Sequence, residues 1–140
     1  MADEMALLVA DIFELAGLLR RSGEAMAARE GQTQARWQFL SVISEEALTV
    51  PQAARRLGVT RQAVQRVANE LLGDGLVEVD ANPDHRTSPL LSLTGRGRGV
   101  LTRISKVAAV ENHRLVRAVG TDAVRTTHHG VRLLAAALRG

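Results

Sequence analysis

The sequence predicts a mainly α-helical chain with one small β-hairpin near its middle, an α+β arrangement with long helices at both ends. Two observations carry this prediction. Apolar residues recur at helical spacing over most of the chain, and two short alternating segments bracket a tip rich in turn residues. At 140 residues the chain has room for one domain with helical extensions. The expected order is helix, helix, short strand, helix, helix, hairpin, helix, helix.

The first expected helix covers roughly residues 3–29 and ends before Gly31. Its apolar residues recur at helical spacing: Leu8, Ile12, Leu15 and Leu19. A second helix follows Thr33. Its expected apolar side consists of Trp37, Leu40, Val42 and Ile43, and Phe39 is also expected in the core.

Two short helices separated by a tight turn are expected next. Thr49 can cap the first, because Gln52 stands three residues later in the capping-box position. This helix should cover about 50–57 and stop at Gly58, since glycine readily adopts the left-handed conformation that ends helices. Thr60 can cap the second, which should end within residues 73–75.

A hairpin and two more helices complete the chain. The segments GLVEVD and LLSLT alternate in polarity and bracket ANPDHRTSP, which is typical of a long hairpin tip. The chain is helical again from Thr94, and a last helix starts after Thr121. The apolar residues of this helix step by three and four: Val124, Thr127, Val131, Leu134 and Leu138. This seam predicts packing on another helix, which we expect a second copy of the chain to supply.

The helix after Thr60 carries an unusual polar face. On a wheel of 100° per residue its inward arc consists of Thr60, Ala63, Val64, Val67 and Leu71. The opposite side, called the outer face below, consists of Gln62, Gln65 and Asn69 with Arg61 and Arg66 at its edges. Gln and Asn pair bidentately with adenine, and Arg pairs with guanine or phosphate. The outer face therefore predicts DNA contacts, and a solvated helix in an ordinary helical hairpin is the alternative.

The spacing of small and apolar residues supports the DNA interpretation. Ala54 stands four residues before Gly58, where two helices of a tight pair approach closely. The small core between them is expected from Leu57, Val59, Val64 and Val67. This pattern is typical of a helix-turn-helix. In the hairpin that follows, Arg86 would reach the minor groove and Asp84 would orient an arginine or stabilise the turn, whereas a solvated turn is the alternative.

Charge and composition narrow the function classes. The net charge is +3, and residues 49–69 hold four arginines and no acid, which suits a nucleic-acid partner. The absence of cysteine excludes disulfides and thiolate metal sites. The adjacent His128 and His129 diverge by about 100° on a helix, so no metal site or other cofactor is expected. The sequence contains no catalytic motif, so we do not expect an enzyme. The acidic N-terminus predicts neither a signal peptide nor a membrane span, so we expect a cytoplasmic protein.

The stretch LTVPQAARRLGVTRQAVQRVANELLGDGLVEV, followed by NPDHRTSPLLSLTGRGR, resembles the MarR family of bacterial transcription regulators, which are winged-helix dimers. The second piece resembles the wing of the family, with its Asp-x-Arg at Asp84 and Arg86. QARWQFLSVI is similar to the second helix of the family. The resemblance covers roughly residues 35–99. The sequence departs from the family at Thr87, where the family commonly has a second basic residue. The wing is therefore expected either to bind DNA more weakly or to have a differently shaped tip.

The resemblance implies a winged helix-turn-helix over 35–99, with helix 61–73 in the major groove and the wing in the minor groove. It implies dimerisation through residues 1–34 and 100–140, and a small-molecule effector between these parts and the DNA-binding part. We therefore expect a homodimeric regulator, with repression as its expected mode, on a pseudo-palindromic site in double-stranded DNA. The alternatives are a winged-helix module that binds protein and a regulator of another winged-helix family.

The expected contact residues divide into three groups. Base contacts are expected of Gln62, Gln65 and Arg66, with Asn69 on the same face. Contacts to the DNA backbone are expected of Thr49, Gln52, Thr60 and Arg61. The wing contributes Arg86, with Asp84 beside it.

Overall fold

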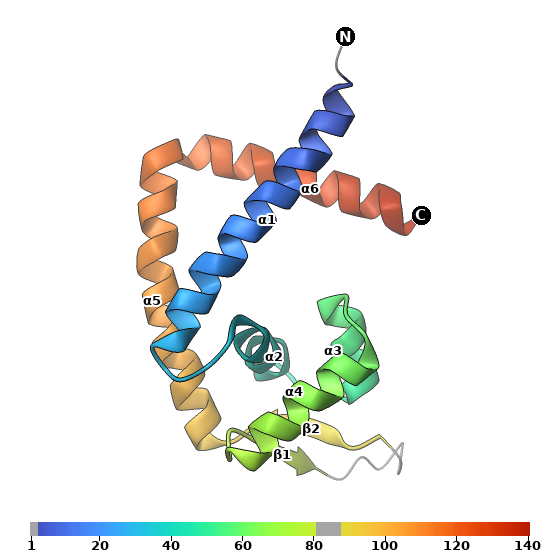
Figure 1. Ribbon diagram of the computed structural model, residues 1–140, viewed down its shortest axis with the longest axis vertical. Helices are drawn as coiled ribbons and strands as arrows, with labels where there is room; N and C mark the ends of the chain where they lie inside the picture. The colour runs from blue at the N-terminus through green and yellow to red at the C-terminus, as the bar shows by residue number, and fades with distance from the viewer. Residues whose placement is uncertain (1–2, 81–87) are drawn as a thin grey trace. The chain divides into compact units, whose positions relative to one another are not determined.

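The computed structural model describes residues 3–80 and 88–140, and its elements follow the expected order (Figure 1). These are α1 Glu4–Ala28, α2 Gln34–Ser44, α3 Val50–Leu57, α4 Arg61–Gly73, β1 Val77–Asp80, β2 Leu90–Leu93, α5 Gly95–Val119 and α6 Thr121–Arg139. The predicted fold class, mainly α with one antiparallel hairpin, is confirmed. The strand expected before α3 was wrong in extent, since it is a single bridge between Leu48 and Leu91 with backbone hydrogen bonds of 3.2 and 2.8 Å.

The chain divides into two compact units, Met1–Ser105 and Lys106–Gly140. The first unit holds α1 to α4, the hairpin and the start of α5. The second holds the rest of α5 and α6. None of the helices in the described residues combines the length and the apolar character that a membrane span requires.

The core of the first unit forms between α2, α4, the hairpin and the first turns of α5. Its largest fully buried side chains are Phe39, Leu40, Val64, Leu71 and Ile104. The expected core positions Phe39 and Leu40 are therefore confirmed, whereas Trp37 is only half-buried at the edge of the cluster. Burial of these five side chains removes apolar surface from water, which is the main force that holds α4 in place.

The hairpin pairs its two strands in antiparallel register, with Val77 opposite Leu93 and Val79 opposite Leu91. Val77, Leu91 and Leu93 are buried, while Val79 on the same face, nearer the open end of β1, is half exposed. At the distal end Ser92 Oγ donates a hydrogen bond of 2.8 Å to Asp80 Oδ2. One face of the hairpin therefore packs on the core, and its strands lead into the segment 81–87.

Helix α1 joins the core only through its C-terminal part, where Gly23 and Ala27 are buried. The apolar side chains nearer its start are exposed: Leu7, Leu8, Ile12, Phe13 and Leu15. This half of α1 therefore presents an apolar surface that nothing in the first unit covers.

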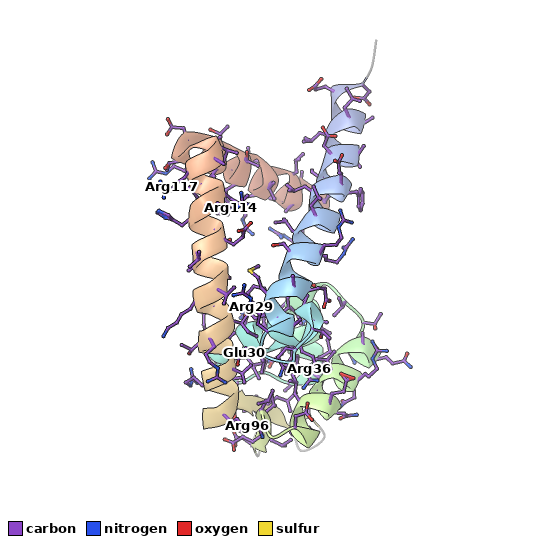
Figure 2. All side chains as sticks on the ribbon, turned by 60° about the vertical axis from the view of Figure 1, so that its left-hand side comes forward. Arg29, Glu30, Arg36, Arg96, Arg114 and Arg117 are labelled. Atoms are coloured by element: carbon purple, nitrogen blue, oxygen red, sulfur yellow. The ribbon has the colours of Figure 1, made fainter. Side chains whose placement is uncertain are left out.

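The second unit is a helix pair joined at Gly120, which has a φ of +92°. No residue of α6 is buried in the single chain, and Val131 and Leu138 of the expected seam are 47% and 89% exposed. On α5 the Arg114 guanidinium hydrogen bonds with the Glu111 carboxylate at 2.6 and 3.0 Å (Figure 2). This hydrogen bond lowers the pKa of Glu111 and raises the pKa of Arg114.

Candidate nucleic-acid interface

Helix α3 begins with the expected capping box. Thr49 Oγ1 accepts a hydrogen bond of 3.3 Å from the Gln52 backbone N–H, and Gln52 Oε1 accepts one of 2.9 Å from the Thr49 backbone N–H. The helix stops at Gly58, whose φ of 68° is the left-handed conformation that favours glycine. The short helix is thus fixed at both ends by local interactions, and its end determines where α4 begins.

Thr60 caps α4 as expected, because its Oγ1 accepts a hydrogen bond of 3.1 Å from the Ala63 backbone N–H. Its side chain is exposed, so Thr60 lies at the surface and not on the inward arc where the wheel placed it. The inward side of α4 is formed by Val64, Ala68 and Leu71, all buried. Ala68, which the wheel did not single out, is fully buried and lets α4 pack closely on the core.

One residue expected in the small core between α3 and α4 does not lie there. Val59 is 49% exposed, because the backbone leaves α3 through Gly58 and carries the side chain outward. Leu57 and Val67 are half-buried against the core, and Val64 is fully buried. The close approach expected at Ala54 is supported by its burial and by the hydrogen bonds that its carbonyl accepts from the N–H groups at 58 and 59.

The outer face of α4 is solvent-exposed along its whole length. Its exposed members are Arg61, Gln62, Gln65, Arg66 and Asn69. Gln65 Nε2 donates a hydrogen bond of 2.9 Å to Asn69 Oδ1. Within the part of the chain that the structure describes, neither Arg61 nor Arg66 forms an ion pair, so both cations are available to an anionic partner.

Two residues expected to contact the DNA backbone differ in accessibility. Thr49 is only 5% exposed and its hydroxyl accepts the capping hydrogen bond, so this buried residue stabilises the start of α3. Gln52 is exposed in the first turn of α3. Its Oε1 is occupied in the cap, which leaves the Nε2 group to donate.

A groove of about 420 Å³ connects the outer face with the hairpin. Its walls come from the start of α3, from α4 and from the hairpin: Val50, Pro51, Arg61, Gln62, Gln65, Leu72, Val79, Ser88, Pro89 and Leu91. Two of the residues expected to read bases, Gln62 and Gln65, therefore line one groove together with both strands. Asp84 and Arg86, expected in the wing, lie outside the described residues.

A polar cluster at the far end of α4 was not foreseen. Arg36 of α2 forms an ion pair with Asp74 at the C-terminus of α4, and Arg96 of α5 donates a hydrogen bond of 3.2 Å to the Asp74 carbonyl (Figure 2). Thr94 Oγ1 donates one of 2.7 Å to the Gly75 carbonyl. These contacts join residues far apart in the chain, so no local pattern could predict them. They fix the end of α4 to α2 and α5.

No group of three or more His, Asp or Glu side chains in residues 3–80 and 88–140 is placed to hold a metal ion. The chemistry that the site offers is hydrogen bonding through amides and charge through arginines.

Comparison with known proteins gives one family. A model of the MarR family matches residues 31–86. An uncharacterized protein of Mycobacterium tuberculosis is 65% identical over 139 residues, which cover 99% of this chain and 97% of that protein. A crystal structure of a MarR family transcription regulator is similar with a TM-score of 0.78 and 27% identity, over 96% of this chain and 91% of that one. The transcriptional repressor CouR bound to a 23-mer DNA duplex has the same fold, with a TM-score of 0.81 and 24% identity over 94% and 95%.

Proposed function

The chain belongs to the MarR family of transcription regulators, and on this premise we propose that it represses transcription as a homodimer on a pseudo-palindromic operator. Each protomer would offer α4 and the hairpin to one half-site, with half-sites about one helical turn of DNA apart. A regulator of this kind acts on the chromosome, in the cytoplasm. Membership of the family sets aside the alternative of a different winged-helix family.

The exposed outer face of α4 is the observation that carries this proposal. A helix needing only solubility gains it from any charged residue, but this face combines three amides with two unpaired arginines in the described chain. Amides and guanidinium groups match the hydrogen-bonding edges of bases in the major groove, which is wide enough to admit a helix. The structure of CouR on a DNA duplex is a precedent for this fold on DNA.

The proposed roles follow from accessibility. Gln62, Gln65 and Arg66 would contact base edges, and Thr60, Arg61 and Gln52 would contact the DNA backbone. We assign Thr49 to the cap of α3, since it is buried. In the wing, Arg86 keeps its predicted role in the minor groove, and Asp84 keeps its predicted role of orienting an arginine or stabilising the turn.

Dimerisation is proposed through the two ends of the chain, residues 1–34 and 100–140, with 35–99 as the DNA-binding region. The support is the uncovered apolar surface on α1 and along the seam of α6. A single exposed apolar side chain is common on protein surfaces and needs no partner. The N-terminal half of α1, however, exposes several of them together: Leu7, Leu8, Ile12, Phe13 and Leu15. A second copy of the chain would bury both surfaces at once.

A small-molecule effector that releases the operator is also proposed. A groove of about 520 Å³ along α2 and the end of α3 offers room for one. Its walls combine the apolar Trp37, Val42 and Leu57 with the charged Glu45 and Arg56. An effector bound there would contact α3 directly and could shift α4 through the turn at Gly58.

The proposal is tested by selecting DNA from random duplexes with the purified protein and measuring its affinity by fluorescence anisotropy at several salt concentrations. The selected sequence should be a pseudo-palindrome, and log K should fall linearly with log salt. Gln65→Ala should cost about 1–3 kcal/mol and relax one base position. Arg86→Ala should weaken binding evenly across sequences.

Glu70→Ala is the matched control, since Glu70 is exposed on the same helix but outside the outer face. It should leave the base preference unchanged. No salt-dependent DNA binding by the wild type would overturn the proposal in favour of a module that binds protein.

A further inference from the structure

Gln65 and Asn69 form a hydrogen-bonded pair in the middle of the outer face. They stand one helical turn apart, and Gln65 Nε2 donates to Asn69 Oδ1 at 2.9 Å. Both side chains are exposed, so the pair is open to a ligand in front of α4. No such amide partner holds Gln62 in the described residues, although it lies on the same face.

The bond leaves Gln65 with a defined set of free groups. A glutamine amide has two N–H donors and one carbonyl acceptor. Asn69 takes one N–H, which leaves one N–H donor and the Oε1 acceptor of Gln65 free. Since the amide plane is tied to the helix at Asn69, free rotation of this donor and acceptor pair is reduced.

We propose that Asn69 is a positioning residue that restricts Gln65 to adenine, an inference that rests on the proposed DNA-binding function. Adenine presents N7 as acceptor and the N6 amino group as donor in the major groove. The remaining N–H of Gln65 donates to N7, and Oε1 accepts from N6. The asparagine thus acts on the base through the glutamine.

The other bases match the held amide less well. Guanine presents two acceptors, N7 and O6, and would need both N–H groups of Gln65, one of which Asn69 occupies. Cytosine offers only its N4 donor, and thymine its O4 acceptor beside a methyl group. Only adenine engages both free groups of Gln65. Removal of Asn69 would free the second N–H and make guanine acceptable.

An intrahelical bond that merely stabilises α4 is the competing explanation, since such pairs strengthen isolated helices slightly. The two explanations predict different base preferences. A purely structural bond would lower affinity for every sequence when it is removed. A positioning bond would raise affinity for guanine at one position while affinity for adenine falls or stays constant.

The test uses full-length protein and the duplex selected from random DNA, with each A·T pair of a half-site changed in turn to G·C. The wild type should prefer adenine over guanine at one position by about tenfold or more. Asn69→Ala should remove most of this preference, mainly through tighter binding of the guanine duplex. Asn69→Asp, which keeps the acceptor, should retain the preference while its added negative charge weakens binding to all duplexes.

A double variant completes the experiment. In a Gln65→Ala background, Asn69→Ala should not change the adenine-to-guanine ratio further. Gln62→Ala is the control and should relax a different position whether or not Asn69 is present. Thermal unfolding of each variant verifies that α4 is folded.

The inference is overturned if Asn69→Ala lowers affinity for the adenine and guanine duplexes equally, or if the ratio does not depend on Gln65. In either case the wild type would still bind its selected DNA, so the proposed function would stand. Failure of the proposed function would appear instead as a wild type that selects no DNA.

Discussion

The backbone at Gly97 in the first turn of α5 lies against the carbonyl group of Leu76. A Cβ atom at this position would overlap the Leu76 carbonyl oxygen and come within 2.9 Å of its carbon. Both partners are backbone atoms held by hydrogen bonds, since the Thr94 N–H donates to Leu76 at 3.1 Å and the Gly97 N–H donates to Thr94 Oγ1 at 3.0 Å. Neither can move without disturbing the junction between the hairpin and α5.

We therefore predict that Gly97→Ala lowers the free energy of unfolding by about 1–3 kcal/mol, the usual cost of overpacking. Urea denaturation at a fixed protein concentration measures it. Gly95→Ala is the matched control, because an added Cβ there meets no atom within 4 Å. It should be neutral or slightly stabilising, since alanine favours helix over glycine. Equal stability of the two variants would contradict the contact at Gly97.

At the scale of single residues, sequence reasoning succeeded where the cause was local. The caps at Thr49 and Thr60 and the stop at Gly58 depend on groups within a few positions, so spacing alone predicts them. Val59 was placed wrongly in the small core because its direction depends on how the chain leaves α3. Gly97 gives no sequence signal at all, since its neighbour Leu76 lies in the turn before β1, far away in the sequence.

At the scale of elements, α4 is held at its C-terminus by charge as well as by apolar burial. The Arg36 side chain is only 15% exposed and pairs with Asp74, while its Nε has no hydrogen-bond partner in the described chain. The guanidinium therefore depends on Asp74 to offset its partial loss of hydration. A charged group left without its partner in such a place costs more than an exposed pair gains.

Asp74→Ala should accordingly lower the free energy of unfolding by about 1–3 kcal/mol. The ion pair between Arg56 and Glu46 is the matched control, because both of its side chains are more than half exposed. Glu46→Ala should change stability by less than about 1 kcal/mol. Comparing the urea midpoints of the two variants tests this. A loss for Glu46→Ala as large as that for Asp74→Ala would show that burial does not set the strength of the Arg36 pair.

The element boundaries were largely predictable, and the contacts between elements were not. Helical spacing predicted α1, α2 and α5, and turn residues predicted the hairpin, because each signal lies within its own element. The ion pair from Arg36 to Asp74 spans 38 positions, and its partners could be any acid in the chain before the fold is known. The outer face of α4 was predictable as a surface, whereas the bond between Gln65 and Asn69 required side-chain positions.

At the scale of the whole molecule, charge and apolar surface are unevenly distributed along the chain. Residues 1–46 carry a net charge of −4, and residues 100–140 carry +5. The exposed apolar residues of α1 and α6 lie within these two ends. Opposite charges on the two ends would favour association of copies through them and keep the acidic end away from DNA phosphates. The proposed dimer is therefore supported by charge as well as by apolar surface.

The seam of α6 gives the sharpest test of the proposed dimer. Leu134 lies within the seam and is half-buried in the single chain, while its seam neighbours Val131 and Leu138 are exposed. A helix partner would bury all three, so a charge at Leu134 should be strongly unfavourable there. Leu134→Asp should convert a species of twice the chain mass into monomers or aggregates, as measured by light scattering.

Thr126→Asp introduces the same charge on α6 at an exposed position about 120° from the seam. The dimer should persist in this variant, which separates the effect of the seam from the effect of one added carboxylate on the helix. DNA affinity should fall in the variant that loses the dimer and persist in the variant that keeps it, because two linked half-site contacts bind far more tightly than one. An unchanged dimer in Leu134→Asp would exclude the seam as the interface and leave the apolar surface of α1 as the remaining candidate.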